Sequence, residues 1–322
     1  MMLRTLLLVA LSAACLSSPL SAQDFPTRTV RIVVPFTAGG ANDGVARALA
    51  DRLSKKWNQP VVVENRPGGA TTIGTRAVID AAPDGHTLLF TSSTSLVVTP
   101  HTTKLAFDPL TDLEPVLLAV SVAPAMAIGN HIPARSVSEL IDYAKKNPGK
   151  LTYASAGTGT YSHVAMEHFK QLAGVDMLHV PYSGTSPAIT DMLGGRIDVY
   201  MVALGVFQDL EKGGKLKIAG MATPERHPDR PDLPTIGETL KGYAIDVWFG
   251  FSAPKKTPVP VLDKLHDDMA EVLRDPAFVD AFVRPQGFTA LKLSRAQFAD
   301  RLKSDYALWG SMVEKAGLAK NQ

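Results

Sequence analysis

The chain has 322 residues, with 33 Lys and Arg against 31 Asp and Glu, and a formal net charge of +2 at pH 7. Hydrophobic residues make up 45% of it and charged residues 20%, which is typical of a globular protein with one large or two medium domains. Because neither sign of charge dominates, the composition argues against a nucleic-acid partner, which would require a basic stripe.

The first 22 residues differ from the rest of the chain. A short positive start at Met1–Arg4 precedes the uncharged apolar run Leu6–Leu16 and a small-residue segment that ends at Ala22. This order predicts a signal peptide over residues 1–22 and export to the periplasm, because the apolar run is too short for a permanent membrane span. Two rivals are lipidation at Cys15, where Ser12 replaces the leucine of such motifs, and a buried N-terminal helix.

Removal of residues 1–22 would also remove Cys15, the one cysteine of the chain. The mature protein would then have no disulfide, no thiol chemistry and no cysteine-bound metal. Its stability would depend on its hydrophobic core alone.

Apolar strands and amphipathic helices alternate along the first half of the chain. The pattern predicts strands at 30–34, 61–63 and 88–90, and helices at 45–56 and from residue 71 or 72 to before Pro83. Strands this apolar fit a mostly parallel sheet covered by helices on both faces. An extended region at 116–128, interrupted by Pro124, ends this first series.

A second α/β series follows. Ser136 and Glu139 predict a capping box at a helix start, and later segments predict strands at 151–154, 177–180, 199–202 and 217–221 and helices at 162–172 and 187–193. Another extended stretch, 246–256, leads to a helical tail from Pro258, in which Ser294 and Gln297 form a second capping box.

The two series predict an α/β protein of two lobes. Lobe 1 would comprise residues 23–124 and 247–322, with the tail helices packed on it, and lobe 2 residues 125–246. One doubly wound sheet is the alternative, but chains of about 300 residues tend to split into separate cores. A cleft between two such lobes is a natural ligand site, because loops at the carboxyl ends of strands converge there.

The sequence contains none of the common motifs for nucleotide binding, acyl transfer or zinc proteolysis. His163 and His168 are five residues apart on one predicted helix and therefore lie on poorly matched faces for a shared metal. We accordingly expect no catalytic residue, no metal and no cofactor.

A small, glycine-rich turn at Thr37–Asn42 stands between the first strand and the first helix. Backbone N–H groups at a helix start carry a partial positive charge, and a turn of Gly and Ala lets an anion approach them closely. Asp43 could cap this helix, and a plain tight turn is the alternative interpretation. Similar turns recur in Ala154–Phe169 and Val180–Gly195, and Thr91–Ser95 ends a third strand.

Together these turns offer backbone and hydroxyl donors without a basic side chain or a general base. That combination predicts recognition of a small carboxylate, with bridging water, rather than turnover.

Several stretches carry a resemblance to a known family, and they cover nearly the whole mature chain in order. They are PFTAGGANDGVAR, VVVENRPGGATTIGT, PDGHTLLF, AGTGTYSHVAMEHF, VPYSGTSPAITDMLGGRIDV, LPTIGE and WFGFSAPKKTP. In these stretches the chain resembles the Bug-type extracytoplasmic solute receptors, the TctC family of substrate-binding proteins of tripartite tricarboxylate transporters. Asn42 stands where Thr or Ser is commoner in that family, so the ligand preference could differ.

The resemblance implies a two-lobe periplasmic-binding-protein type II fold, with mixed sheets joined by two crossing strands, that closes on its ligand. It also implies a small carboxylate or related amide as ligand, and the membrane subunits of a tripartite tricarboxylate transporter as partners; we expect a monomer. Expected ligand contacts are Phe36, Thr37, Ala38, Gly39, Gly40, Asn42 and Asp43 in lobe 1, Ala156, Gly157, Thr158, Gly159, Thr160, Ser162, Tyr182, Ser183, Thr185 and Ser186 in lobe 2, and Ser93, Ala203 and Trp248 near the cleft.

Two other functions stay open from the sequence. A ligand-sensing accessory protein would use the same cleft but dock on a membrane receptor. A periplasmic two-lobe enzyme would need a reactive Cys, Lys or carboxylate pair in the cleft, which the turns do not show. The identity, length and chirality of the ligand are not encoded in these motifs.

Overall fold

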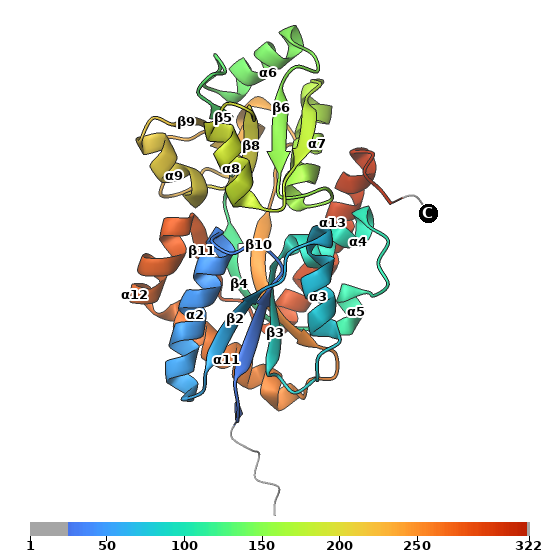
Figure 1. Ribbon diagram of the computed structural model, residues 1–322, viewed down its shortest axis with the longest axis vertical. Coiled ribbons are helices and arrows are strands. Elements are labelled where there is room, and N and C mark those ends of the chain that lie inside the picture. The colour runs from blue at the N-terminus through green and yellow to red at the C-terminus, as the bar shows by residue number, and fades with distance from the viewer. Residues whose placement is uncertain (1–24, 321–322) are drawn as a thin grey trace, which may run out of the picture.

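The computed structural model describes residues 25–320 (Figure 1), so the predicted signal peptide lies outside the described residues. The elements of lobe 1 before the crossover are β1 (Val30–Val34), α2 (Ala41–Trp57), β2 (Val61–Asn65), η1 (Gly69–Thr71), α3 (Thr72–Ile79), β3 (Thr87–Ser92), η2 (Thr94–Val98), α4 (Thr99–Thr102), α5 (Pro109–Asp112) and β4 (Leu113–Val122). Those of lobe 2 are β5 (Pro124–Gly129), α6 (Val137–Lys146), β6 (Thr152–Ser155), α7 (Tyr161–Ala173), β7 (Leu178–Pro181), α8 (Thr185–Leu193), β8 (Val199–Ala203), α9 (Gly205–Lys212), β9 (Leu216–Met221) and α10 (Ile236–Thr239). The chain then returns to lobe 1 with β10 (Val247–Pro254), α11 (Val259–Arg274), α12 (Pro276–Phe278), η3 (Val279–Val283), η4 (Arg284–Gln286), β11 (Phe288–Ala290) and α13 (Arg295–Lys315).

Each lobe is built on one mixed sheet, which confirms the predicted α/β fold class. The lobe 1 sheet has six strands in the order β11-β4-β10-β3-β1-β2, and the lobe 2 sheet has five in the order β7-β6-β8-β5-β9. In each sheet three strands pair in parallel, β2-β1-β3 and β7-β6-β8, and the remaining strands pair antiparallel. The parallel part therefore matches the βαβ pattern of the sequence. The expectation of a mostly parallel sheet is wrong, because the crossing strands and the edge strands β9 and β11 pair antiparallel.

Two extended segments connect the lobes, as Figure 1 shows. Strand β4 continues through Ala123 into β5, and β10 returns antiparallel to β4 along its whole length, from Val247 to Pro254. All eight residues of β10 are buried, because β10 lies between β4 and β3 in the middle of the sheet. The lobes are thus hinged on two adjacent strands.

The C-terminal helices pack on lobe 1, where buried indole groups join them to the rest of the lobe. Trp57 of α2 donates from Nε1 to Asp268 Oδ2 of α11 at 2.6 Å, and Trp248 of β10 donates to Asp305 Oδ2 of α13 at 2.7 Å. Asp268 is buried, and the tryptophan and Lys264 satisfy its carboxylate. Ser294 and Gln297 form the predicted capping box of α13.

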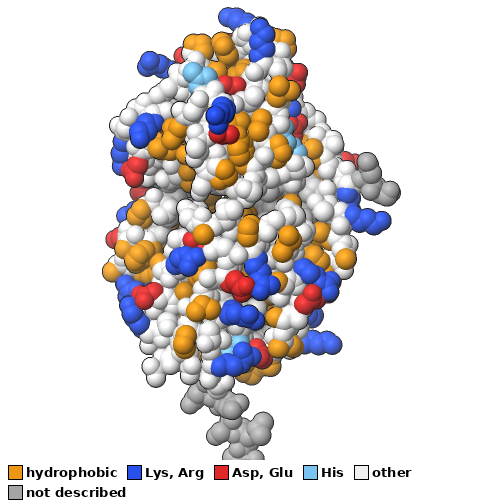
Figure 2. All heavy atoms as spheres, viewed as in Figure 1, with side chains coloured by type: hydrophobic (Ala, Val, Ile, Leu, Met, Phe, Trp, Pro, Cys, Tyr) orange, Lys and Arg blue, Asp and Glu red, His pale blue; other side chains and the backbone are white. Residues whose placement is uncertain are grey.

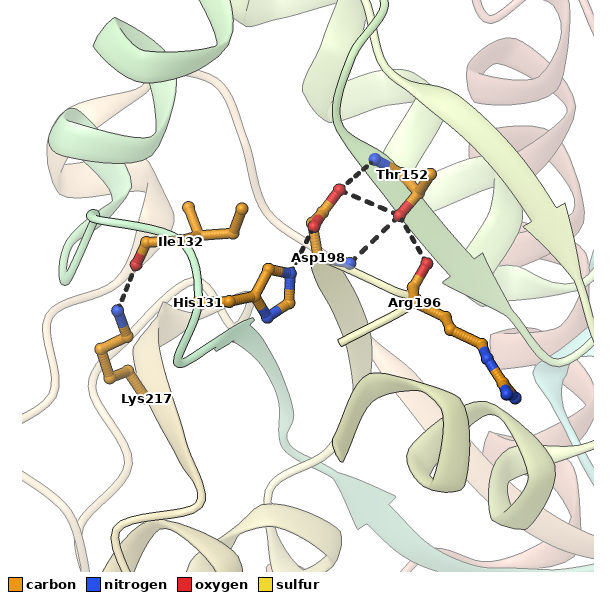
Figure 3. A network of polar contacts seen from close by, with 6 residues as sticks. All are labelled: His131, Ile132, Thr152, Arg196, Asp198 and Lys217. Atoms are coloured by element: carbon orange, nitrogen blue, oxygen red, sulfur yellow. Dashed lines mark hydrogen bonds and ion pairs between the residues drawn. The ribbon is translucent and has the colours of Figure 1, made fainter. Parts of the chain in front are cut away.

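The end of lobe 2 that is remote from lobe 1 is tied together by Asp198, which precedes β8 (Figure 3). Its carboxylate accepts hydrogen bonds from the backbone N–H and hydroxyl of Thr152, at 2.6 and 3.0 Å, and from His131 Nε2 at 2.6 Å. These contacts hold the starts of β6 and β8 and the end of β5 together. The opposite, carboxyl ends of β6 and β8 then face lobe 1.

Candidate ligand-binding site

A small cavity of about 50 Å³ lies where the carboxyl ends of strands from both lobes meet. It has room for several water-sized groups, since one water needs about 10–15 Å³ of such space. The segments after β1, β3, β6 and β8 converge there, at the points where the connections of each sheet diverge, which is where open α/β sheets bind ligands. The lining residues are Phe36, Asn42, Ser92, Ala156, Tyr161, Thr185, Val202, Ala203, Val206, Phe249 and Phe288.

The first binding turn is held from behind by Asp43. One oxygen of its carboxylate accepts from the Gly39 N–H at 3.0 Å and from Arg47 Nε at 2.9 Å, and the other accepts from Asn65 Nδ2 at 2.9 Å. Burial opposes ionisation, but these hydrogen bonds outweigh it and hold the pKa of Asp43 below its usual value. The carboxylate is thus fully used in shaping the turn and is not aimed at a ligand.

The second binding turn, before α7, is held by its own hydroxyls and by two histidines. Ser162 Oγ accepts from the Ala156 N–H at 3.1 Å, and Thr160 Oγ1 donates to Gly157 O at 2.7 Å. His163 Nδ1 accepts from the Gly159 N–H at 3.1 Å, so this nitrogen carries no proton.

The ring of His163 stacks on that of His179, with centroids 3.9 Å apart, and His179 Nε2 bonds to Ser155 Oγ at 2.7 Å. Ser155 Oγ in turn accepts from the Gly157 N–H at 3.2 Å. Burial, together with the neighbouring His179, lowers the pKa of His163 to about 4. Both rings are therefore neutral near pH 7 and support the turn as uncharged acceptors.

Unpartnered donors remain at the cavity. Asn42, in the first turn of α2, is 7% exposed, and its Nδ2 is buried without a hydrogen-bond partner. Helices α2, α7, α8 and α9 begin at the cleft without a side-chain cap, so the first N–H groups of these helices have no capping acceptor from a side chain. Buried donors of this kind are costly unless something accepts from them, so the site is prepared for an acceptor.

None of the described residues that line the cavity carries a formal charge. In Figure 2 the visible seam between the lobes is mostly white, so few charged side chains lie on it. Blue and red side chains lie on the lobes above and below it. An anion bound here would rest on N–H dipoles and hydroxyls alone.

The lobes touch across the cleft. Thr94 Oγ1 of lobe 1 accepts from the Tyr161 N–H at 3.2 Å, and Thr102 Oγ1 donates to Gly159 O at 3.3 Å. Gly184 packs so closely on Thr37 that a Cβ at residue 184 would lie 2.3 Å from Thr37 Oγ1. The structure is therefore a closed form of the two lobes.

Five of the residues expected as ligand contacts line the cavity: Phe36, Asn42, Ala156, Thr185 and Ala203. Others shape the turns or the lobe contact instead, namely Thr37, Gly39, Asp43, Gly157, Gly159, Thr160 and Ser162. Ala38, Thr158, Ser183 and Ser186 are exposed, Gly40 is the N-cap residue of α2, and Ser93 is fully buried beside the lining residue Ser92.

Two further expected contacts, Trp248 and Tyr182, do not line the cavity. Trp248 is 1% exposed and lies on the far face of β10, because its indole donates to Asp305 and packs on Phe298; Phe249 faces the cavity instead. The hydroxyl of Tyr182 donates to Asp191 at 2.8 Å, on α8. Burial and Asp191 raise the pKa of Tyr182 to about 12, so this phenol stays uncharged. Its hydrogen bond to Asp191 stabilises lobe 2.

The lining residues that were not among the expected ligand contacts are mainly apolar: Tyr161, Val202, Val206, Phe249, Phe288 and Ser92, the last of which lies in the stretch Thr91–Ser95. Tyr161 lies inside the predicted second turn. Phe288 belongs to the short strand β11, in the segment between the two predicted tail helices, where no pattern indicates a strand.

A second depression, open and of about 680 Å³, lies beside the cleft between α9 and the η3–η4 segment. Its charged side chains pair with one another, as Arg230 does with Glu211 at 2.9 Å and Arg284 with Asp280 at 3.4 Å, so it offers no unpartnered donor comparable to Asn42. Between residues 25 and 320, no three His, Cys, Asp or Glu side chains cluster as metal ligands. No helix in that range has the length and apolar character needed to cross a membrane.

Comparison with known proteins places the chain in a family. The model of the TctC family, described as the tripartite tricarboxylate transporter family receptor, matches residues 45–318. Three solved structures that resemble the chain are Rpa4515 of R. palustris with adipate (TM-score 0.88, 30% identity, 92% of this chain and 99% of that one), the periplasmic binding protein BugD (0.84, 34%, 92% and 100%) and MatC of Rhodopseudomonas palustris with bound malate (0.84, 31%, 90% and 100%). With a family match over most of its length and the same two-lobe fold, the chain belongs to the TctC family and is a Bug-type solute-binding receptor of the tripartite tricarboxylate transporter class.

Proposed function

We propose that this receptor captures a small carboxylate between its two lobes. The observation that carries the proposal is the buried Asn42 amide, whose Nδ2 lacks a partner at the wall of an uncharged cavity. A carboxylate oxygen is a strong acceptor that satisfies this donor and the free N–H groups at the start of α2 together. The ligands of two similar receptors, adipate and malate, support the same chemistry.

Recognition without a basic side chain suits a receptor that must release its ligand. A buried ion pair would leave an unpaired charge in the protein after release, and this is expensive. Dipolar donors return to water as the lobes part, at a smaller cost. We infer that Asn42, Ser92, Thr185 and the turns before α2 and α7 hold the acid group.

Thermal unfolding with and without acids tests this function. Butanoate, hexanoate, succinate, adipate, malate and citrate are each added in excess; an acid present at 100 times its Kd stabilises the folded state by about 2.7 kcal/mol. The matched variant Asn42→Leu, which keeps the side-chain size but has no amide donor, should lose most of this shift. Absence of a shift with every acid would contradict the proposal.

The wider role follows from the family. We propose that the receptor works in the periplasm after removal of residues 1–22, as a monomer, and delivers the acid to the membrane subunits of a tripartite tricarboxylate transporter. Lobe 1 would comprise residues 23–124 and 247–322 and lobe 2 residues 125–246, a division supported by the membership of the two sheets. We further propose that it has no enzymatic activity, so an acid recovered from the complex is chemically unchanged, as mass spectrometry would record.

A further inference from the structure

The polarity of the side chains that line the cavity differs between the two sides of the lobe 1 sheet. In the sheet order, Phe288 of β11 and Phe249 of β10 lie on one side, and Ser92 of β3 and Asn42 after β1 lie on the other. Phe249 is directly opposite Ser92 in the β10–β3 pair. Its ring packs on that of Phe288, with centroids 5.6 Å apart, so the two rings form one continuous apolar wall.

Lobe 2 shows the same change in the same direction. Thr185 and Ala156 follow β7 and β6 on one side, and Val202 and Val206 belong to β8 and α9 on the other. The close contacts between the lobes fix how these sides align. Thr37, after β1, meets Gly184 before α8, and Gln286, before β11, meets Gly205 of α9.

The cavity therefore has a polar end and an apolar end. The polar end combines Asn42, Ser92 and Thr185, and the apolar end combines Phe249, Phe288, Val202 and Val206, a list taken from both lobes. The ring of Phe36, which follows β1 on the side of the polar end, meets that of Phe249 with centroids 6.4 Å apart, so the apolar wall continues from Phe249 toward the polar end. No side chain of the apolar end has an N–H or O–H group. A charged group placed there would lose its hydration without gaining a side-chain partner, which is strongly unfavourable.

We propose that the ligand is a monocarboxylate with an apolar body, its acid group at the polar end and its carbon chain or ring against Phe249 and Phe288. This inference rests on the proposed function and makes it narrower, because it excludes di- and tricarboxylates as preferred ligands. The rival arrangement places a second carboxylate on the backbone N–H groups at the start of α9, which also reaches the apolar end.

Calorimetric titration with matched acids tests the proposal. Butanoate is compared with succinate and hexanoate with adipate, so that each pair has one carbon number and differs only in the second carboxylate. The monocarboxylate of at least one pair should bind tenfold tighter or more than its partner. Hexan-1-ol, which keeps the chain but has no acid group, should bind at least tenfold more weakly than hexanoate.

A charge placed at the apolar end should reverse the preference. In Val206→Arg the guanidinium can pair with a second carboxylate, so the ratio of adipate to hexanoate affinity should rise tenfold or more. Val259→Arg is the matched control, because Val259 also begins a helix but is 61% exposed on α11, away from the cavity. It should leave the ratio unchanged.

The possible outcomes test carboxylate capture and the preference for a monocarboxylate separately. If succinate and adipate bind the unaltered protein as tightly as butanoate and hexanoate, the inference is overturned and carboxylate capture stands. If none of the four acids binds but malate or citrate does, the inference is overturned and carboxylate capture stands. If none of the six acids binds, carboxylate capture fails and the inference fails with it. If Val206→Arg raises the ratio and Val259→Arg does not, the position of the apolar end is supported.

Discussion

Replacement of Gly184 by alanine tests whether the lobes meet in the ligand-bound protein as they do in the structure. Gly184 has an extended backbone, with φ of 164°, so alanine is compatible with its conformation. The added Cβ would lie 2.3 Å from Thr37 Oγ1 and 3.4 Å from Thr37 Cβ and Cγ2. Because non-bonded heavy atoms are most stable at about 3.5–4.0 Å, the two turns would have to separate by about 1 Å.

The cost of this overpacking is about 1–3 kcal/mol, and it falls on the closed form alone. Ligand affinity should therefore fall by about 5- to 150-fold in Gly184→Ala. The unfolding temperature of the free protein should change little, because opening of the lobes relieves the contact.

The assay is calorimetric titration of the tightest acid found for the unaltered protein. Gly194→Ala is the matched control, since it lies at the other end of α8, where a Cβ would come no closer than 3.4 Å to Thr190 O. The double variant Gly184→Ala/Thr37→Ala removes the clashing Oγ1 and should recover the affinity of Thr37→Ala alone, as a double-mutant cycle measures. Unchanged affinity in Gly184→Ala would refute the reasoning, as would a fall in the unfolding temperature of the free protein that matches the loss of affinity.

Three further predictions concern residues around the site. Asn42→Ala should weaken binding of the acid about tenfold, by calorimetry, while the free protein unfolds at the same or a higher denaturant concentration, because an unpartnered buried amide is removed; a clear loss of stability without loss of affinity would contradict its role. Trp248→Phe should lower the free energy of unfolding by about 1–3 kcal/mol, because Asp305 loses a buried donor, and should leave the affinity for the acid unchanged. Weakened binding of the acid would indicate that Trp248 contacts the ligand. His163 has a pKa of about 4 in the folded protein against about 6.5 when unfolded, so the unfolded chain binds more protons between these values and stability falls as pH drops from about 6.5 to about 4. This fall in the free energy of unfolding amounts to about 3 kcal/mol for His163. His179, Glu167 and Lys170 face the same ring. Denaturant titrations at pH 7 and pH 4.5 should show a smaller fall for His163→Gln than for the unaltered protein, and an equal fall would contradict this role of His163.

The sequence predicts the fold well because the two βαβ series are locally consistent. Apolar runs fix β1, β3 and β8 as buried strands, and the two extended stretches identify the crossing strands between the lobes. The expected capping at Ser136 is present, although Glu139 accepts from the Arg135 N–H rather than from the cap residue itself. Strand β11 is missed because three residues at a sheet edge carry too little alternation to indicate a strand.

The site is predicted less completely, for reasons that particular residues make clear. All eight positions of β10 are buried, so hydropathy does not reveal which of Trp248 and Phe249 faces the cleft. Ser162 and Asp43 are hydrogen-bonding residues of the right kind in the right turns, but they are used within the protein. Ser162 accepts from a backbone N–H of its own turn, and Asp43 accepts from the Gly39 N–H and from the side chains of Arg47 and Asn65. A sequence displays its donors and acceptors, and only the three-dimensional packing determines which of them, like Asn42, stay unpartnered.

A crystal structure of the protein soaked or co-crystallised with hexanoate tests the central claim most directly. The account predicts an acid oxygen within hydrogen-bonding distance of Asn42 Nδ2 and the carbon chain against Phe249, with no Lys or Arg side chain in contact with the acid. An acid group paired with a basic side chain, or seated at the Phe288 and Val206 end, would contradict it.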